Sequence, residues 1–150
     1  NVSVEEIPVD ENTLTIEMVP ATYEGVQQIA SIDPYALQQM ETTAGTMSVK
    51  FEPYGDTGNM VACTDTVGSI LVRGVEFTKK ARSLAVCSMG TGRIEVRENH
   101  PEGKLVAIID ADSAEMSETK VRLAASPASV TDLCFLFKGA ELKIDSWQFR

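Results

Sequence analysis

Asp145 is the residue whose surroundings most clearly demand a chemical partner. It lies in the run Ile144-Asp-Ser-Trp-Gln-Phe149, among apolar and aromatic side chains. Such a run is typical of a buried strand, and burying a carboxylate without a partner is energetically expensive. We therefore expect something to pair with Asp145, and a metal ion is one candidate.

No catalytic signature accompanies this acid. The chain contains no Gly-x-Ser-x-Gly elbow, phosphate-binding loop or zinc-binding helix motif. A glycosidase would need two carboxylates on either side of one bond, and no pair among the 22 acidic residues stands out from the rest. We expect a non-catalytic domain.

The cysteines do not predict a metal site either. Cys63, Cys87 and Cys134 are far apart, and the chain has a single histidine. This spacing argues against zinc. Cys87 and Cys134 fall inside apolar strand patterns, where free cysteines usually pack as small hydrophobic residues. The odd count excludes full internal pairing but leaves one disulfide bridge open.

Composition narrows the class of protein. The 150 residues are 43% hydrophobic and carry a net charge of -9. One domain with one core is expected at this length. The negative charge argues against nucleic acid and against an anionic membrane surface as partners. No apolar run approaches the length of a membrane-spanning helix.

The first residues lack the basic start and apolar stretch of a signal peptide. Because Asn1 is not a methionine, we expect a processed product or a piece of a longer protein.

Short strands separated by turns must position Asp145. The predicted strands cover 14–19, 70–77, 83–87, 93–97, 104–109, 120–124, 133–137 and 140–149, with turns at 89–92 and 99–103 and a loop at 125–129. Gly74 suggests a bulge in the second of these strands. Leu133 to Phe137 are apolar at every position, which predicts a strand buried on both faces. This spacing predicts an all-β fold, an antiparallel sandwich or barrel.

The beginning of the chain has a different character. Residues 19–32 contain Pro and Gly and show no clear period, which indicates an extended linker. Residues 33–40 permit a short helix capped by Asp33, but they fit a strand better, with Gln39 and Glu41 on one face. We therefore predict a strand and linker over 1–32, the tail of a preceding domain, and a sandwich over 33–150.

The closing strands also carry a family resemblance. Phe135-Leu-Phe-Lys-Gly139 and Leu142-Lys-Ile-Asp-Ser-Trp-Gln-Phe149 resemble the last strands of family 6 carbohydrate-binding modules. Upstream, Gly68-Ser-Ile-Leu-Val-Arg-Gly-Val-Glu-Phe77 is similar to the strand that begins Gly-Asp-Tyr/Trp in that family. Asp33-Pro-Tyr35 and Gln39-Met-Glu41 resemble the Asn-Pro-Tyr and Glu-Ala-Glu that open modules attached to family 43 glycoside hydrolases. The lead-in Thr22–Ile29 resembles the linker between those hydrolases and the module.

The resemblance implies a jelly-roll-like antiparallel β-sandwich with a structural calcium ion. The family's calcium ligands match Gln39, Glu41 and Asp145 in this sequence. Gln39 offers an amide oxygen in place of a carboxylate, and calcium accepts such ligands. The alternative is that Glu41 and Asp145 accept hydrogen bonds or pair with a cation such as Lys50.

The resemblance also points to a sugar-binding cleft between loops at one end of the sandwich. Where the family places two aromatic rings and an asparagine, this chain has Cys63, the aromatic-free segment Ala111–Glu118 with Met116, and Lys143. Tyr54, in a turn-rich segment, is a candidate platform, whereas Trp147 is expected in the core. An aromatic-free surface around Cys63, Tyr54, Met116 and Lys143 would favour a purely structural role.

Two functions follow as expectations. In the first, the chain is a non-catalytic module that binds a plant cell-wall polysaccharide of the xylan or arabinoxylan type, covalently linked to a glycoside hydrolase. In the second, it is a structural accessory domain that has lost sugar binding at the loop cleft. Either implies an extracellular or periplasmic protein.

Overall fold

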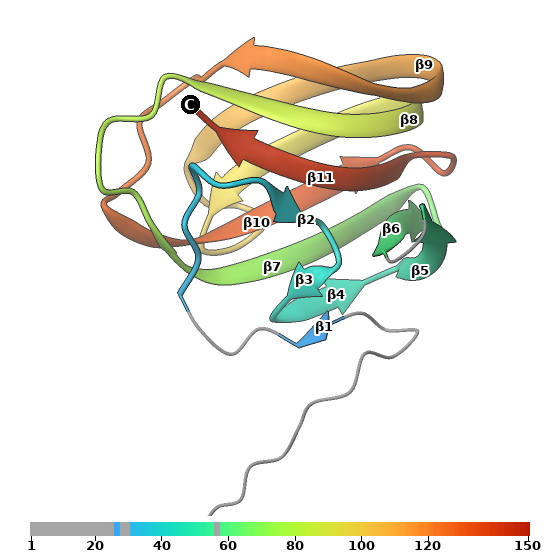
Figure 1. Ribbon diagram of the computed structural model, residues 1–150, viewed down its shortest axis with the longest axis horizontal. Coiled ribbons are helices and arrows are strands. Elements are labelled where there is room, and N and C mark those ends of the chain that lie inside the picture. The colour runs from blue at the N-terminus through green and yellow to red at the C-terminus, as the bar shows by residue number, and fades with distance from the viewer. Residues whose placement is uncertain (1–25, 28–30, 56–57) are drawn as a thin grey trace, which may run out of the picture.

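The computed structural model describes residues 26–27, 31–55 and 58–150, and the regular elements in these ranges are strands (Figure 1). The predicted strand at 14–19 and most of the predicted linker lie outside them. The strands are β1 (Val26–Gln27), β2 (Gln38–Gln39), β3 (Thr42–Thr43), β4 (Gly45–Met47), β5 (Val49–Tyr54), β6 (Gly58–Cys63), β7 (Val67–Glu76), β8 (Ser83–Glu98), β9 (Leu105–Arg122), β10 (Val130–Lys138) and β11 (Lys143–Phe149). No helix in the described ranges is long and apolar enough to cross a membrane.

One long strand, β8, joins the two layers of the molecule. Its first half, Leu84–Met89, pairs with β11, and its second half, Arg93–Glu98, pairs with β10. The large sheet has the order β4-β7-β10-β8-β11-β6-β5, and its pairings are antiparallel. The sheet therefore folds over on itself, as Figure 1 shows. The predicted jelly-roll-like antiparallel β-sandwich is confirmed.

Two glycines allow β8 to bend where it passes from one layer to the other. Gly90 has a φ of 89°, and a Cβ there would lie 2.1 Å from the carbonyl oxygen of Glu141. At Gly92 a Cβ would lie 2.5 Å from the carbonyl oxygen of Lys138. Only residues without a side chain allow the bent part of β8 to approach the turn after β10 this closely.

The predictions for the middle of the chain were partly wrong. The turn expected at 89–92 is a bend inside β8, because β9 pairs with β8 along both halves. The segment Ala111–Glu118, which the family resemblance places in a loop of the cleft, is part of the long strand β9. Its small and polar residues do not alternate with apolar ones, so the sequence did not predict a strand there. Pairing with β8 keeps this segment extended.

The hairpin of β5 and β6 was not predicted. Pro53 and Gly55 suggested a loop, yet Lys50 and Glu52 lie in register with Ala62 and Met60. The position of β5 at the edge of the sheet explains why it tolerates a proline, since an edge strand leaves some N–H groups unpaired.

The bulge expected at Gly74 is confirmed. Gly74 has a φ of 63°, and the register of β7 against β10 shifts between Leu133 and Thr131. The carboxylate of Asp132 accepts the N–H of Gly74 at 2.9 Å, so the bulge is held by a side chain.

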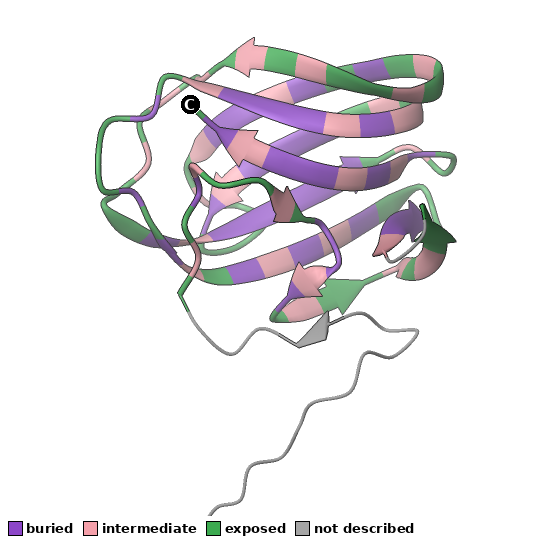
Figure 2. Ribbon diagram, viewed as in Figure 1, coloured by how far each residue is buried: buried purple, intermediate pink, exposed green. Residues whose placement is uncertain are grey.

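The aromatic side chains gather in one core between the layers. Phe135, Phe137, Trp147 and Phe149 are at most 1% exposed. Trp147 packs against Phe135 and Phe149 with ring centroids 5.3 and 5.8 Å apart. Figure 2 shows buried residues running along β8, β10 and β11. The core position expected for Trp147 and the two-sided burial of Leu133–Phe137 are both found.

Tyr35 holds the first residues of the sandwich in place. Tyr35 packs edge-on against Phe77 at 6.1 Å, and its hydroxyl donates to the carbonyl oxygen of Lys79. The segment 33–41 forms no helix. A turn at Met40–Glu41 interrupts the expected strand, and Gln39 is exposed while Glu41 is buried. Gln39 and Glu41 are therefore not alternate positions of one strand, contrary to the prediction.

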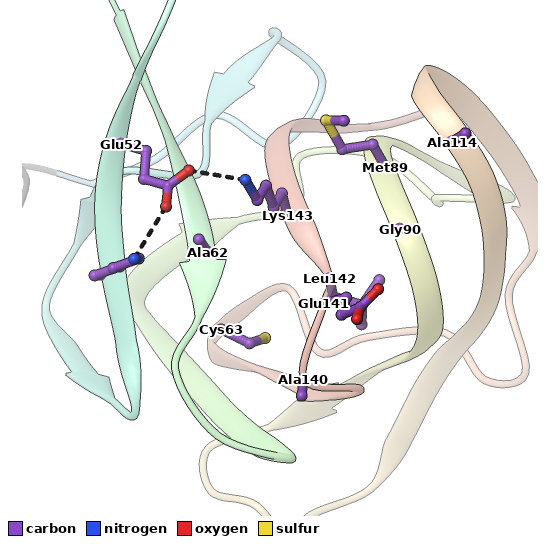
Figure 3. Close-up of a pocket in the computed structure, with 11 residues that line it drawn as sticks. Glu52, Ala62, Cys63, Met89, Gly90, Ala114, Ala140, Glu141, Leu142 and Lys143 are labelled. Carbon is purple, nitrogen blue, oxygen red and sulfur yellow. Dashed lines mark hydrogen bonds and ion pairs between the residues drawn. The ribbon is translucent and has the colours of Figure 1, made fainter.

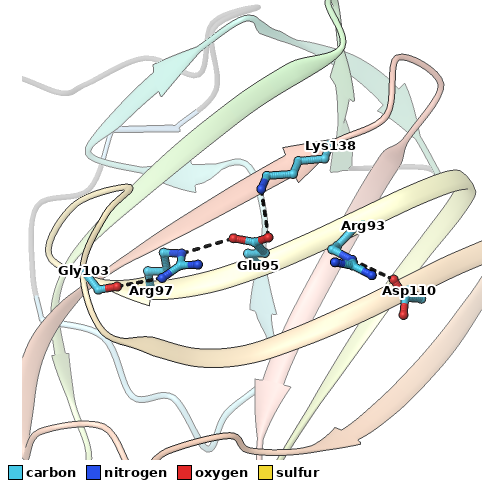
Figure 4. Close-up of polar contacts among 6 residues, drawn as sticks. All are labelled: Arg93, Glu95, Arg97, Gly103, Asp110 and Lys138. Atoms are coloured by element: carbon cyan, nitrogen blue, oxygen red, sulfur yellow. Dashed lines mark hydrogen bonds and ion pairs between the residues drawn. The ribbon is translucent and has the colours of Figure 1, made fainter.

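A buried acid on the outer face of the sheet links β8 to β10. Glu95 is only 6% exposed, and its two oxygens accept Arg97 Nε at 3.1 Å and Lys138 Nζ at 2.9 Å. Figure 4 shows this cluster beside the more exposed pair of Arg93 and Asp110. Hydrogen bonds from Lys138 and then Arg97 hold the pKa of Glu95 below its usual range, against the opposing effect of burial.

This depressed pKa predicts how stability depends on pH. The stabilisation from Glu95 is complete above the ordinary glutamate pKa of about 4.3 and is lost as the pH falls through the lower pKa of the folded state. Glu95→Gln should cost about 1–3 kcal/mol at neutral pH and flatten the loss of stability in acid, measured by denaturant unfolding across this pH range. Arg93→Gln, which breaks the exposed pair, is the control and should leave both quantities nearly unchanged. An acid limb as steep in Glu95→Gln as in the parent would contradict the assignment.

Candidate functional site

A hollow of about 490 Å³ lies at the end of the sandwich where β8 bends. Its walls come from β5, β6, the bend of β8, β9 and the turn between β10 and β11 (Figure 3). Small residues, among them Ala62, Gly90, Ala114 and Ala140, keep it open. None of the 11 lining residues is aromatic. We call this the loop hollow.

Two lysines and one glutamate form its charged side. Lys143 Nζ lies 3.0 Å from Glu52 Oε1, and Lys50 Nζ lies 3.2 Å from Glu52 Oε2. Hydrogen bonds from Lys143 and then Lys50 lower the pKa of the Glu52 carboxyl. Because all three side chains are partly exposed, these pairs contribute at most about 1 kcal/mol each. Their main effect is to fix the polar groups that a ligand would meet.

Cys63 contributes an inert thiol to the same hollow. The residue is 8% exposed, and burial raises its pKa to about 11. At neutral pH the thiol is therefore protonated, and the thiolate needed for nucleophilic chemistry is absent. All three cysteines are free. Cys134 is buried as expected, whereas Cys87 is only half-buried.

The structure brings two of the four predicted sugar-site residues together. Cys63 and Lys143 line the loop hollow. Tyr54 lies at the end of β5, 39% exposed, and Met116 is half-buried on β9, and neither lines the hollow. The hollow thus has polar groups without the aromatic platform that stacks on a sugar ring.

Sequence reasoning missed Lys50 and Glu52. Glu52 was placed in a turn-rich loop, and Lys50 was considered only as a cation partner of Glu41 and Asp145. Val49 and Phe51 nevertheless alternate with them as in a strand with one charged face. That alternation was the available signal. Pro53 obscured it.

Main-chain pairing brings the residues predicted to bind a metal close together. β2 pairs with β11, with Gln39 opposite Ser146, and the N–H of Met40 donates to the carbonyl oxygen of Asp145 at 2.9 Å. Gln39 and Glu41 therefore flank the residue that is bonded to Asp145. β11 is irregular at this point, since its register against β8 shifts between Ile144 and Ser146.

The two acids at this place lack cationic partners among the described residues. Lys50, named as a possible partner, pairs with Glu52. Glu41 is 9% exposed and accepts the N–H of Asn59 at 2.8 Å. Burial raises the pKa of Asp145, and a hydrogen bond from Ser146 opposes this shift. The described residues contain no cluster of three or more His, Cys, Asp or Glu side chains suited to a metal, which agrees with Gln39 standing where a third acid would be.

Comparison with known proteins gives one curated relative and a set of solved structures. The arabinoxylan arabinofuranohydrolase of Bacillus subtilis (strain 168) is 32% identical over an alignment 150 residues long, gaps included; the alignment covers 90% of this chain and 29% of that protein. The chain therefore spans less than a third of the length of this relative. No family model matches the chain.

The solved structures include both the enzyme and separate modules. A family 43 arabinoxylan arabinofuranohydrolase from Bacillus subtilis, in complex with cellotetraose, aligns over 86% of this chain and 30% of its own, with a TM-score of 0.72 and 28% identity. A family 6 module from Clostridium stercorarium, in complex with cellobiose, aligns over 80% of this chain and 96% of its own, with a TM-score of 0.73 and 17% identity. A β-1,3-glucan-binding module from Bacillus halodurans aligns over 81% and 99%, with a TM-score of 0.73 and 20% identity.

Proposed function

From the premise that this chain has the fold of family 6 carbohydrate-binding modules, we propose that it is a non-catalytic module that binds a plant cell-wall polysaccharide of the xylan or arabinoxylan type. It is covalently linked to a glycoside hydrolase and works outside the cytoplasm. The observation that carries this proposal is the pattern of coverage. Separate modules align over 96–99% of their own length, whereas an arabinoxylan-degrading enzyme of higher identity aligns over only 30% of its length.

The loop hollow is the proposed binding place. It is large enough for a sugar ring, since ligand pockets start near about 300 Å³. Lys143, Lys50 and Glu52 supply charged donors and acceptors for hydroxyl groups. Binding through hydrogen bonds alone is expected to be weak, because the aromatic stacking that excludes water from a sugar face is missing.

Affinity electrophoresis through gels that contain arabinoxylan or xylan tests this function. We expect retardation relative to a gel without polysaccharide, and a weaker effect for Lys143→Ala. Lys120→Ala, which removes the same charge from an exposed residue of β9 that does not line this hollow, is the matched control. Equal mobility in all gels across a broad panel of polysaccharides would overturn the proposal.

A second function is favoured by one observation: none of the described residues that line the loop hollow is aromatic. In this alternative the chain is a structural accessory domain that stabilises or shapes the linked hydrolase. It predicts no retardation in any gel, together with a lower melting temperature of the hydrolase when the domain is removed.

We also propose a structural calcium ion held by Gln39, Glu41 and Asp145. The donor set supports this, since two carboxylates and an amide, with main-chain carbonyl oxygens nearby, suit a hard cation. The buried Glu41 and half-buried Asp145 have no cationic partner among the described residues. When bound, the ion would offset the cost of burying these acids and tie β2 to β11.

Removal and readdition of calcium test this site. A chelator should lower the melting temperature, and added calcium should restore it, because a ligand of the folded state stabilises that state. Asp145→Asn should be about as stable as the chelated parent and should gain nothing from calcium. Glu102→Gln, at an exposed site in the turn between β8 and β9, should respond like the parent. If neither the chelator nor added calcium changes the melting temperature of the parent, the proposal is contradicted.

A further inference from the structure

A second hollow, of about 390 Å³, lies at the opposite end of the sandwich from the loop hollow. It is formed by the segment before β8 and by the end of β9 with the loop that follows. Figure 1 shows these segments together beside the C-terminus, away from the turn between β10 and β11. Among the residues that the structure describes, three cations line it, Lys80, Arg82 and Arg122, and no acidic residue does. We call it the basic hollow.

The three cations of the basic hollow are exposed and lack acidic partners. In the ranges 31–55 and 58–150, none of Lys80, Arg82 and Arg122 forms an ion pair. The neighbouring Arg150 differs, because it lies 3.7 Å from Glu118. The loop hollow differs too, since Glu52 holds both of its lysines. A gathering of unpaired positive charge is unusual in a chain of net charge -9.

The walls of the basic hollow are fixed by main-chain hydrogen bonds. The N–H of Leu123 donates to the carbonyl oxygen of Arg82 at 3.2 Å, and Ser83 lies in register with Arg122. The carbonyl oxygen of Arg150 accepts the N–H of Ser83 at 2.9 Å. Arg82 directly precedes β8 and Arg122 ends β9, so both lie on backbone that is already held in place. A ligand would not have to order this backbone.

We propose that the basic hollow binds the carboxylate of a uronic acid carried as a side group by a mostly neutral polysaccharide. A guanidinium group presents a planar pair of donors that matches a carboxylate, and two arginines with a lysine give such a group several charge-assisted hydrogen bonds. The hollow has the volume of a small-ligand site rather than of an extended interface. The inference rests on the proposed function in taking the ligand to be a polysaccharide, but it assigns a site separate from the loop hollow.

The charge of the whole chain favours a sparsely charged ligand. A polymer with dense negative charge is repelled by a surface of net charge -9, and three cations offset little of that repulsion. A neutral polymer with occasional carboxylates is not repelled along its length and gains the local attraction. An acidic peptide is the competing class of ligand, and its binding is an outcome of the test.

The experiment compares glucuronoxylan with the same polymer after reduction of its carboxylates to alcohols. Affinity electrophoresis is run at low and high salt, with neutral arabinoxylan in a third gel. We expect stronger retardation by the carboxylated polymer, lost at high salt because the attraction is screened. Arg122→Gln should weaken binding to this polymer by about tenfold, the loss expected for one charge-assisted hydrogen bond. It should leave binding to the reduced polymer unchanged.

Lys120→Gln is the matched control. Lys120 is an exposed residue of β9 that does not line the basic hollow. Its substitution removes the same charge as Arg122→Gln. Equal retardation by the carboxylated and reduced polymers, or equal losses in Lys120→Gln and Arg122→Gln, would overturn the inference. Competition by a glutamate-rich peptide as effective as that by glucuronate oligosaccharides would overturn it in favour of a protein partner. Retardation by neutral arabinoxylan reports separately on the proposed function, so the two can fail independently.

Discussion

A Trp147→Ala variant is expected to lose about 3–5 kcal/mol of unfolding free energy, the range typical of large aromatic residues removed from a core. Trp147 is 1% exposed and packs against Phe135 and Phe149, which lie on different strands. Its loss would leave a cavity where the two layers meet. Chemical denaturation, followed by circular dichroism, measures the change.

Trp147→Phe is the graded control. It keeps an aromatic ring in place, and the indole N–H that it removes has no hydrogen-bond partner among the described residues. We expect a loss of about 1–2 kcal/mol, well below that of alanine. A Trp147→Ala variant as stable as the parent would mean that this side chain is not part of the core. Because Trp147 is the single tryptophan, its fluorescence should also report unfolding and remain insensitive to added sugars.

Gly90→Ala should destabilise the protein by about 2–5 kcal/mol, the sum of two separate costs. A positive φ costs an L-residue about 1–2 kcal/mol, and Gly90 has a φ of 89°. Forcing a Cβ to within 2.1 Å of the carbonyl oxygen of Glu141 adds overpacking of about 1–3 kcal/mol. Thermal and denaturant unfolding measure the total.

Gly55→Ala separates the two costs. Gly55 has a φ of 73°, but a Cβ there would meet nothing within 4 Å. This variant should lose only the backbone term, so the difference between the two variants measures the close approach of β8 to the turn after β10. Equal losses at both positions would show that this contact does not constrain the bend. Since Gly90 also lines the loop hollow, its variant should alter any ligand binding there as well.

The fold was predictable where apolar residues follow a strict pattern. Leu133–Phe137 are apolar at every position, and the structure buries all of them. Single residues with a special backbone role were also informative, as Gly74 shows with its bulge. By contrast, β9 continues through small and polar residues because β8 lies beside it, and such a partner is invisible in local sequence.

The candidate site was harder to predict for a related reason. Cys63 and Lys143 come together because β6 pairs with β11, with Ala62 opposite Lys143. Lys50 and Glu52 join them through the hairpin of β5 and β6, which Pro53 concealed. The basic hollow was missed entirely, since Lys80 and Arg82 lie far from Arg122 in sequence and meet only through the pairing of β8 with β9.

The place of β11 in the sheet has a consequence for how the protein is made. β11 is the last strand of the sequence, yet it lies between β8 and β6 and also pairs with β2. Until it has been synthesised, β6 and the first half of β8 each have one unpaired edge, although β5 and β9 pair with their other edges. The core also lacks Trp147 and Phe149. Unpaired strand edges and exposed apolar surface favour aggregation. We therefore expect the sandwich to close only after β11 has been synthesised, rather than strand by strand during translation.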